Sequence, residues 1–128
     1  DADKKRAVLQ PIISNRQAQE ELNKVGLSYP TGHCPQVKLS GYFLSGGMSW
    51  NQGTWGHGYE ALEAIEMVTA EGKKITASAT ENQDYFWAAR GSGPGFFAVC
   101  TRYHLKCFPL PKAITSSAFN AISGIFKA

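Results

Sequence analysis

The sequence predicts an α+β domain: a mostly antiparallel sheet of four or five strands with two or three helices. Three observations lead to this fold class. Residues 96–108 alternate between apolar and polar side chains, residues 62–78 carry a strand–turn–strand pattern, and Ser14 with Gln17 forms a helix-start signal. The chain has 128 residues, of which 43% are hydrophobic and 18% charged, so it suits one globular domain.

The first predicted strand and helix lie at the N-terminal end. The apolar, β-branched run at 6–13 predicts a strand. Ser14 followed by Gln17 is a capping-box pattern, so we expect a helix over 15–24, with Gly26 as its left-handed stop. We expect three side chains of this helix to be buried: Ala18, Leu22 and Val25.

The second half of the chain supplies most of the predicted sheet. Residues 62–69 and 74–78 predict a hairpin with a Glu-Gly turn between them. Residues 83–90 predict a short helix. Its two core-facing aromatic residues would be Phe86 and Trp87. The alternation over 96–108 predicts a long half-buried strand. Its core face would carry Phe97, Val99, Thr101, Tyr103 and Leu105.

Composition argues against several classes of partner. The net charge is +3, and the one tight basic cluster, at 4–6, is typical of a solvated edge rather than of a nucleic-acid interface. No apolar run approaches the roughly 20 residues of a membrane span, and no signal peptide is predicted at the start. The three cysteines are an odd number without a CxxC pair, which argues against a disulfide framework. These observations do not indicate a cellular compartment.

The segment 31–58 gathers seven glycines, two tryptophans, two histidines and one cysteine. A zinc site is not supported, because the spacings match no known ligand pattern. A Cys34 nucleophile activated by His33 is a second interpretation, although adjacent side chains diverge. A phosphate-binding loop would need a GxGxxG or P-loop pattern, which the segment lacks. The residues alone fit equally well a wall for a flat ligand and a tightly folded loop with structural aromatics.

Several segments together resemble one family. "GHCPQVKLSGYFLSGG" is similar to a signature of FAD-linked oxidases of the berberine bridge enzyme-like group, which have a PCMH-type FAD-binding domain. "VTAEGKK", "ENQDYFWAARG" and "FFAVCTRYHL" resemble that family's next hairpin, helix and strand. The resemblance covers residues 1–112 and implies the second half of an FAD-binding domain. Residues 113–128 would then begin a truncated substrate domain.

The resemblance also implies a set of cofactor-binding residues. They are His33, Cys34, Val37, Ser40, Gly41, Tyr42, Gly46, Gly47, Gly58 and Ile65. Cys34 matches the position whose sulfur is bonded to carbon 6 of the flavin in some members. Tyr42 stands where many members place a histidine near the N1–C2=O edge of the flavin. A backbone contact of Ile65 with the adenosine end is also implied. No catalytic base and no metal ligand are identified in this chain.

The function that the resemblance implies is that of a fragment of an FAD-dependent oxidoreductase. Such an oxidase moves a hydride from an alcohol, sugar or amine carbon to the flavin and then passes electrons to oxygen. The implied partners are FAD, a small-molecule substrate read by a domain absent here, and the missing N-terminal and substrate subdomains. The alternative is a non-catalytic α+β module that binds no flavin on its own.

Overall fold

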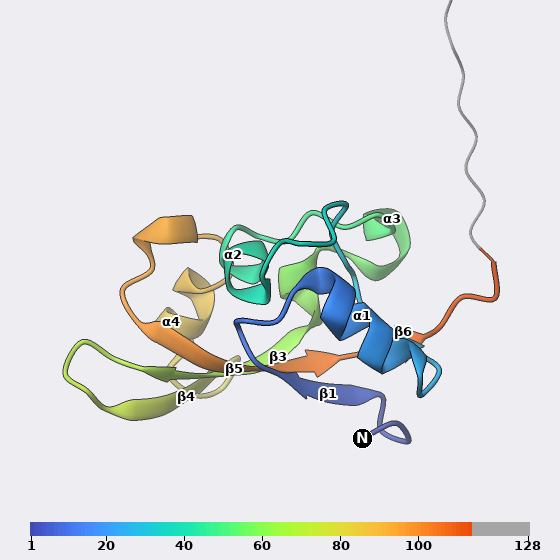
Figure 1. The fold of residues 1–128 in the computed structure, drawn as a ribbon. Helices are drawn as coiled ribbons and strands as arrows, with labels where there is room; N and C mark the ends of the chain where they lie inside the picture. The colour runs from blue at the N-terminus through green and yellow to red at the C-terminus, as the bar shows by residue number, and fades with distance from the viewer. Residues whose placement is uncertain (114–128) are drawn as a thin grey trace, which may run out of the picture.

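The structure is a computed structural model that describes residues 1–113 (Figure 1). Its main sheet has the strand order β1-β5-β3-β4, and every neighbouring pair is antiparallel. These strands are β1 (Arg6–Leu9), β5 (Val99–Lys106), β3 (Leu62–Val68) and β4 (Lys74–Ser78). A second, two-stranded sheet pairs β2 (Leu27–Ser28) with β6 (Phe108–Pro109). The predicted α+β class and the hairpin of β3 and β4 are confirmed.

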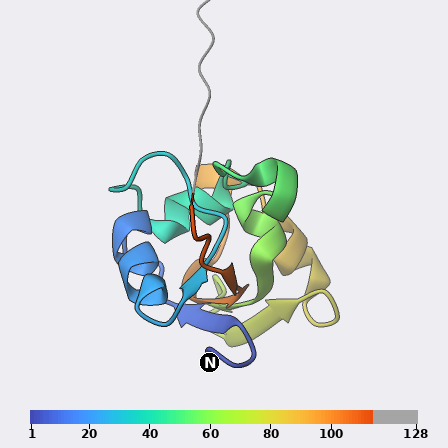
Figure 2. The ribbon, with the colours of Figure 1, turned by 90° about the vertical axis from the view of Figure 1, so that its right-hand side faces the viewer.

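Helices lie over one face of the main sheet, as Figures 1 and 2 show. The α-helices are α1 (Asn15–Asn23), α2 (Leu39–Leu44), α3 (Gln52–Trp55) and α4 (Gln83–Ala88), and the 3₁₀ helices are η1 (Gly58–Ala61) and η2 (Gly93–Gly95). The core fills the space between the two layers, and its largest fully buried side chains include Tyr29, Phe43, Ile65 and Tyr103. Helices α2 and α3 lie in the glycine-rich segment, where no helix was predicted.

The predicted start of α1 is confirmed in atomic detail. The Gln17 amide N–H donates to Ser14 Oγ at 3.2 Å, and the Ser14 amide N–H donates to Gln17 Oε1 at 2.9 Å. Both predicted core residues within the helix are buried: Ala18 and Leu22. Val25 is 54% exposed, so that prediction was wrong, because the helix ends at Asn23 and Val25 lies in the turn beyond it. Gly26 has the expected positive φ, 71°.

Strand β1 ends at Leu9, although the sequence predicted a strand as far as Ile13. The segment that follows leaves the sheet and pairs with the start of α2. The Leu39 amide donates to the Ile13 carbonyl and the Ser40 amide donates to the Pro11 carbonyl, both at 3.0 Å. These carbonyl groups satisfy donors of the first turn of α2, which has no side-chain cap.

A β-bulge in β5 overturns part of the predicted core face. Tyr103 and Leu105 are buried as predicted, whereas Phe97, Val99 and Thr101 are exposed. Across β3 and β5, Glu66 pairs with Arg102 and Met67 pairs with Cys100, so Thr101 is the extra residue. Its hydroxyl donates to the Glu66 carbonyl at 3.1 Å. One extra residue reverses the alternation, so Cys100 packs against the core in place of Val99.

Helix α4 buries only one of its two predicted core aromatics. Phe86 is 4% exposed, but Trp87 is 77% exposed, so the prediction for Trp87 was wrong. Consecutive side chains on an α-helix lie about 100° apart, so a short surface helix turns only one narrow face toward the core. Trp87 is therefore left on the surface of the domain.

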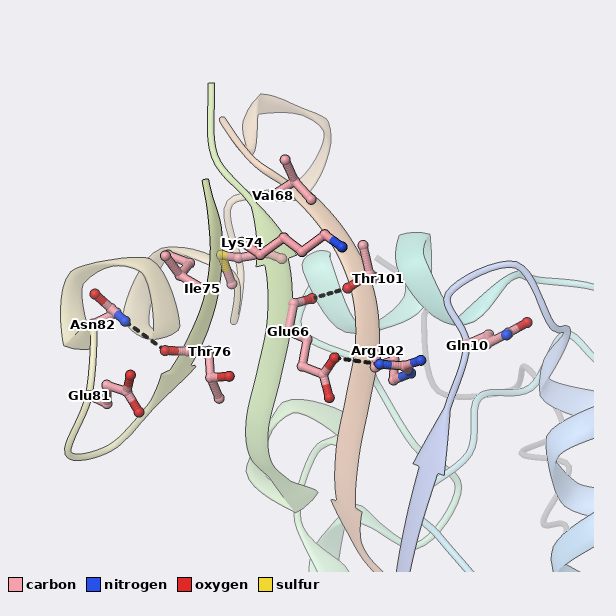
Figure 3. A pocket seen from close by; sticks show the side chains of 11 residues that line it. Gln10, Glu66, Val68, Lys74, Ile75, Thr76, Glu81, Asn82, Thr101 and Arg102 are labelled. Carbon is pink, nitrogen blue, oxygen red and sulfur yellow. Dashed lines mark hydrogen bonds and ion pairs between the residues drawn. The ribbon is translucent and has the colours of Figure 1, made fainter. Parts of the chain in front are cut away.

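The opposite face of the sheet carries mostly polar side chains, and none of the helices in residues 1–113 covers it (Figure 3). Arg102 Nη1 donates to Glu66 Oε2 at 2.7 Å, and His104 Nε2 lies 2.9 Å from Glu66 Oε1. The hydrogen bonds with His104 and then with Arg102 lower the pKa of Glu66. Its carboxylate therefore stabilises the fold above its ordinary pKa, and this contribution is lost as the pH falls through the lowered value. The contribution is small because water screens the group.

The predicted second unit, residues 113–128, lies outside the described residues apart from Ala113. It therefore stays a prediction. Among the described residues, none of the helices has both the length and the apolar character that crossing a bilayer requires.

Replacing Ser14 by alanine is expected to lower the free energy of unfolding by about 1 kcal/mol, because the capping box would lose the acceptor for the Gln17 amide. Urea unfolding followed by circular dichroism measures this loss. The matched control is Ser92→Ala, since Ser92 precedes η2 but makes no side-chain capping bond. Equal losses in the two variants would contradict the role assigned to the capping box.

Candidate functional site

A cavity of about 440 Å³ opens beside Cys34. Its lining comes from the start of α1, the loop before α2, α2 itself and the loop after it. The lining residues are Asn15, Gly32, His33, Cys34, Val37, Gly41, Tyr42, Ser45, Gly47 and Met48. Cys34 is an exposed free thiol, so the sulfur is accessible to a ligand in this cavity.

The loop that carries Cys34 is fixed by the N-terminus of α1. The Asn15 amide donates to the Val37 carbonyl and the Arg16 amide donates to the Pro35 carbonyl, both at 2.9 Å. A helix start leaves its first N–H groups without intrahelical partners, and here the loop carbonyls accept from two of them. The side chain of Asn15 is also buried, and its Oδ1 accepts from Tyr29 Oη at 2.6 Å. The loop that carries Cys34 is therefore held by the start of α1 on the C-terminal side of the thiol, at Pro35 and Val37.

Tyr42 connects three parts of the glycine-rich segment. Its ring is 7% exposed, and its hydroxyl lies 2.8 Å from the Pro30 carbonyl oxygen and 3.0 Å from that of Gly47. Burial raises the pKa of Tyr42 well above its ordinary value, so the phenol keeps its proton. That single proton is donated to the backbone of Pro30 or Gly47 in this structure.

Three glycines are explained by the ring of Tyr42 rather than by any ligand. A Cβ at Gly58 would lie 2.5 Å from Tyr42 Cε1, and a Cβ at Gly32 would lie 2.9 Å from Tyr42 Cε2. A Cβ at Gly47 would lie 2.9 Å from the Gly58 Cα, and the Gly58 amide donates to the Gly47 carbonyl at 2.6 Å. Gly41 is different, because it lines the cavity and a Cβ there would meet nothing within 4 Å. The floor at Gly41 is open to a flat group.

The cavity brings together only part of the set of cofactor-binding residues that the sequence predicted. The predicted residues that line it are His33, Cys34, Val37, Gly41, Tyr42 and Gly47. Those that do not are Ser40, Gly46, Gly58 and Ile65. Ile65 is fully buried in β3, between its partners Ala77 and Tyr103 on the two neighbouring strands. Its contact with the adenosine end of a cofactor stays a prediction.

Sequence reasoning missed four residues of the lining: Asn15, Gly32, Ser45 and Met48. Gly32 and Ser45 directly flank predicted site residues, so proximity in the sequence could have suggested them. Asn15 gave no such signal, because it lies far from Cys34 in the sequence and reaches the cavity only through the packing of α1 against the loop.

His33 stacks on Trp50 rather than contacting the thiol next to it. The ring centroids are 3.6 Å apart and the planes differ by 4°. Within residues 1–113 no hydrogen bond joins His33 to Cys34, so the interpretation of an activated Cys34 nucleophile gains no support from this geometry. In the same residues, no group of three or more His, Cys, Asp or Glu side chains is arranged to hold a metal ion.

Comparison with known families identifies the fold of this site. A sequence model described as "FAD binding domain" matches residues 1–78, which include every residue that lines the Cys34 cavity. The chain belongs to the FAD-binding domain family. Residues 79–113 extend beyond the match and add α4 and β5 to the domain.

Individual relatives of this FAD-binding domain are longer proteins. The FAD-linked oxidoreductase ptmO of Penicillium ochrochloron is 38% identical over 109 residues, which are 85% of this chain and 24% of that protein. The carbohydrate oxidase of Microdochium nivale is 37% identical over 93 residues, or 73% of this chain and 19% of that protein. The crystal structure of 6-hydroxy-D-nicotine oxidase from Arthrobacter nicotinovorans superposes with a TM-score of 0.81 at 31% identity. That match covers 88% of this chain and 24% of the other. The chain thus spans about a quarter of the length of such relatives.

Gly58→Ala is expected to destabilise the domain by about 1–3 kcal/mol, because the new methyl group would overlap the Tyr42 ring. In a Tyr42→Leu background the same change is expected to cost clearly less. Urea unfolding of the two single variants and the double variant measures this coupling. Gly53→Ala is the matched control, since a Cβ there meets nothing within 4 Å and Gly53 lies in α3. Equal costs of Gly58→Ala in both backgrounds would contradict the packing role of Tyr42.

Proposed function

We propose that this chain forms one wall of the flavin pocket in an FAD-dependent oxidase. The observation that carries this proposal is the accessible thiol of Cys34 beside a cavity with an open glycine floor, in a member of the FAD-binding domain family. The relatives named above as an FAD-linked oxidoreductase and a carbohydrate oxidase support the same reaction class.

The residues of the cavity suit a flat, partly apolar group. The volume of about 440 Å³ lies within the range of roughly 300–1,000 Å³ that is usual for small-molecule sites. Gly41 leaves the floor open, while Val37 and Met48 are exposed apolar residues at its edge. We propose that the isoalloxazine lies against this surface. When bound, the flavin supplies the ability to accept a hydride and to pass electrons onward.

Cys34 is the proposed point of covalent attachment. Its thiolate would take the place of the hydrogen on carbon 6 of the flavin, in keeping with the family resemblance. That hydrogen would leave as a proton, and the two electrons released would pass through the flavin to oxygen, the acceptor proposed below. The hydrogen bonds from α1 to the carbonyls of Pro35 and Val37 would hold the thiol in one position during this reaction. Cys100 and Cys107 are the chain's other thiols and line no part of the cavity.

Tyr42 has a supporting role in this proposal. Because its hydroxyl proton is donated to backbone carbonyl groups, the residue holds the shape of the cavity rather than stabilising charge on the cofactor. We propose that an alcohol, sugar or amine carbon gives up the hydride and that oxygen receives the electrons. The proton-transfer base is expected from a substrate domain, as the resemblance implies.

The full-length natural protein that contains this chain is expected to be yellow, and its flavin is expected to stay in the pellet after acid precipitation. Visible absorbance spectra before and after precipitation measure this. Cys34→Ala is expected to change the spectrum of the retained flavin or to release it. Cys100→Ala is the matched control, because Cys100 packs on the core side of β5.

The possible outcomes separate the parts of the proposal. If the full-length natural protein is colourless and takes up no added FAD, the oxidase function is overturned and the non-catalytic module is favoured. If the protein is yellow and Cys34→Ala changes neither the amount nor the spectrum of the flavin in the pellet, the covalent link is overturned and cofactor binding stands. Loss of flavin in Cys100→Ala as well would point to a damaged fold rather than to a lost bond.

A further inference from the structure

A second pocket, of about 590 Å³, lies where α4 meets the loop to η2. It is lined by Tyr59, Trp87, Ala88, Arg90, Gly91, Ser92, Gly95 and Phe97. None of these residues lines the Cys34 cavity. Among the described residues that form it, Arg90 alone carries a charge, so the pocket is cationic.

The guanidinium of Arg90 lies near two aromatic rings but has no anionic partner in residues 1–113. Its Cζ lies 4.4 Å from the ring centroid of Phe86 and 6.0 Å from that of Tyr59. Its Nε is buried without a hydrogen-bond partner. Aromatic stacking covers the faces of a guanidinium, whereas the N–H groups in its plane still require an acceptor. Nε is too buried to meet a ligand, so the two Nη groups, which make no hydrogen bond in residues 1–113, are the donors that the pocket can offer.

The walls of the pocket are aromatic and exposed. Trp87 is 77% exposed and Phe97 is 56% exposed, and the Phe97 ring packs against that of Tyr85 at 5.2 Å. Gly91 and Gly95 leave the backbone uncovered, since a Cβ at either position would meet nothing within 4 Å. An apolar wall beside one oriented cation matches a ligand that joins a flat apolar body to a negative group.

We propose that the Arg90 pocket binds an aryl carboxylate. The guanidinium fork would take the carboxylate through paired hydrogen bonds, and Trp87 and Phe97 would cover the apolar body. A single cation favours a carboxylate, with one negative charge, over a phosphate, which carries more charge and more acceptor oxygens to satisfy. This inference does not depend on flavin binding.

The test is a nuclear magnetic resonance titration of the full chain with phenylacetate as the probe. The indole N–H signal of Trp87, assigned with Trp87→Phe, is expected to shift in a saturable manner. Arg90→Gln is expected to weaken binding about tenfold or more, because charge-assisted hydrogen bonds are lost. Arg102→Gln, on the opposite face of the sheet and paired with Glu66, is the matched control and is expected to bind as the unaltered chain does.

Further ligands fix the chemical class. Benzyl alcohol, which has the ring without the charge, is expected to give no saturable shift at the same concentrations. Equal binding of benzyl alcohol, or equal binding of phenylacetate by Arg90→Gln, would overturn the role of the guanidinium. Tighter binding of inorganic pyrophosphate than of phenylacetate would overturn the carboxylate assignment. The spread of the amide signals shows whether each variant is folded. In a folded variant, absence of the shift means that binding is lost.

Discussion

The arrangement of the glycine-rich segment depends on the burial of one tyrosine ring. Tyr42 stands on the short helix α2 and is packed so closely by Gly32, Gly47 and Gly58 that a methyl group on any of them would require the chain to move. Its hydroxyl lies within hydrogen-bond distance of the carbonyl oxygens of Pro30 and Gly47 and donates its single proton to one of them. These contacts bring the loops on both sides of α2 together with the start of η1. The shape of the Cys34 cavity follows from this packing.

The start of α1 performs two tasks with one set of backbone donors. Ser14 and Gln17 form the capping box, while the amides of Asn15 and Arg16 hold the carbonyls of the Cys34 loop. Helix formation and the placement of the thiol are therefore coupled, because loss of the first helical turn would release the loop. This coupling explains how a loop without strand or helix geometry can present an exposed sulfur in a fixed position.

The sheet separates surfaces with different chemistry. On its open face, Glu66 pairs with Arg102 and His104 (Figure 3). On the helical side, the Cys34 cavity and the Arg90 pocket lie on either side of η2, where a Cβ on Gly93 would lie 3.9 Å from Ser45 Oγ. Arg102 thus has a carboxylate partner, whereas Arg90 has none in residues 1–113 and its Nε lacks an acceptor.

The sequence by itself determined the features that depend on neighbours along the chain. Its periodicity and turn residues were sufficient for the α+β class, the hairpin of β3 and β4 and the capping box at Ser14, because hydrogen bonding and burial there follow local spacing. The resemblance in residues 32–47 placed Cys34 and Gly41 in one candidate site. Tertiary structure alone decided that Thr101 is bulged and that Trp87 faces solvent. It also decided that Asn15 lines the cavity and that the Tyr42 ring leaves no room for a side chain at Gly58. Each of these outcomes depends on contacts between residues distant in the sequence, and local patterns carry no record of which distant atoms will meet.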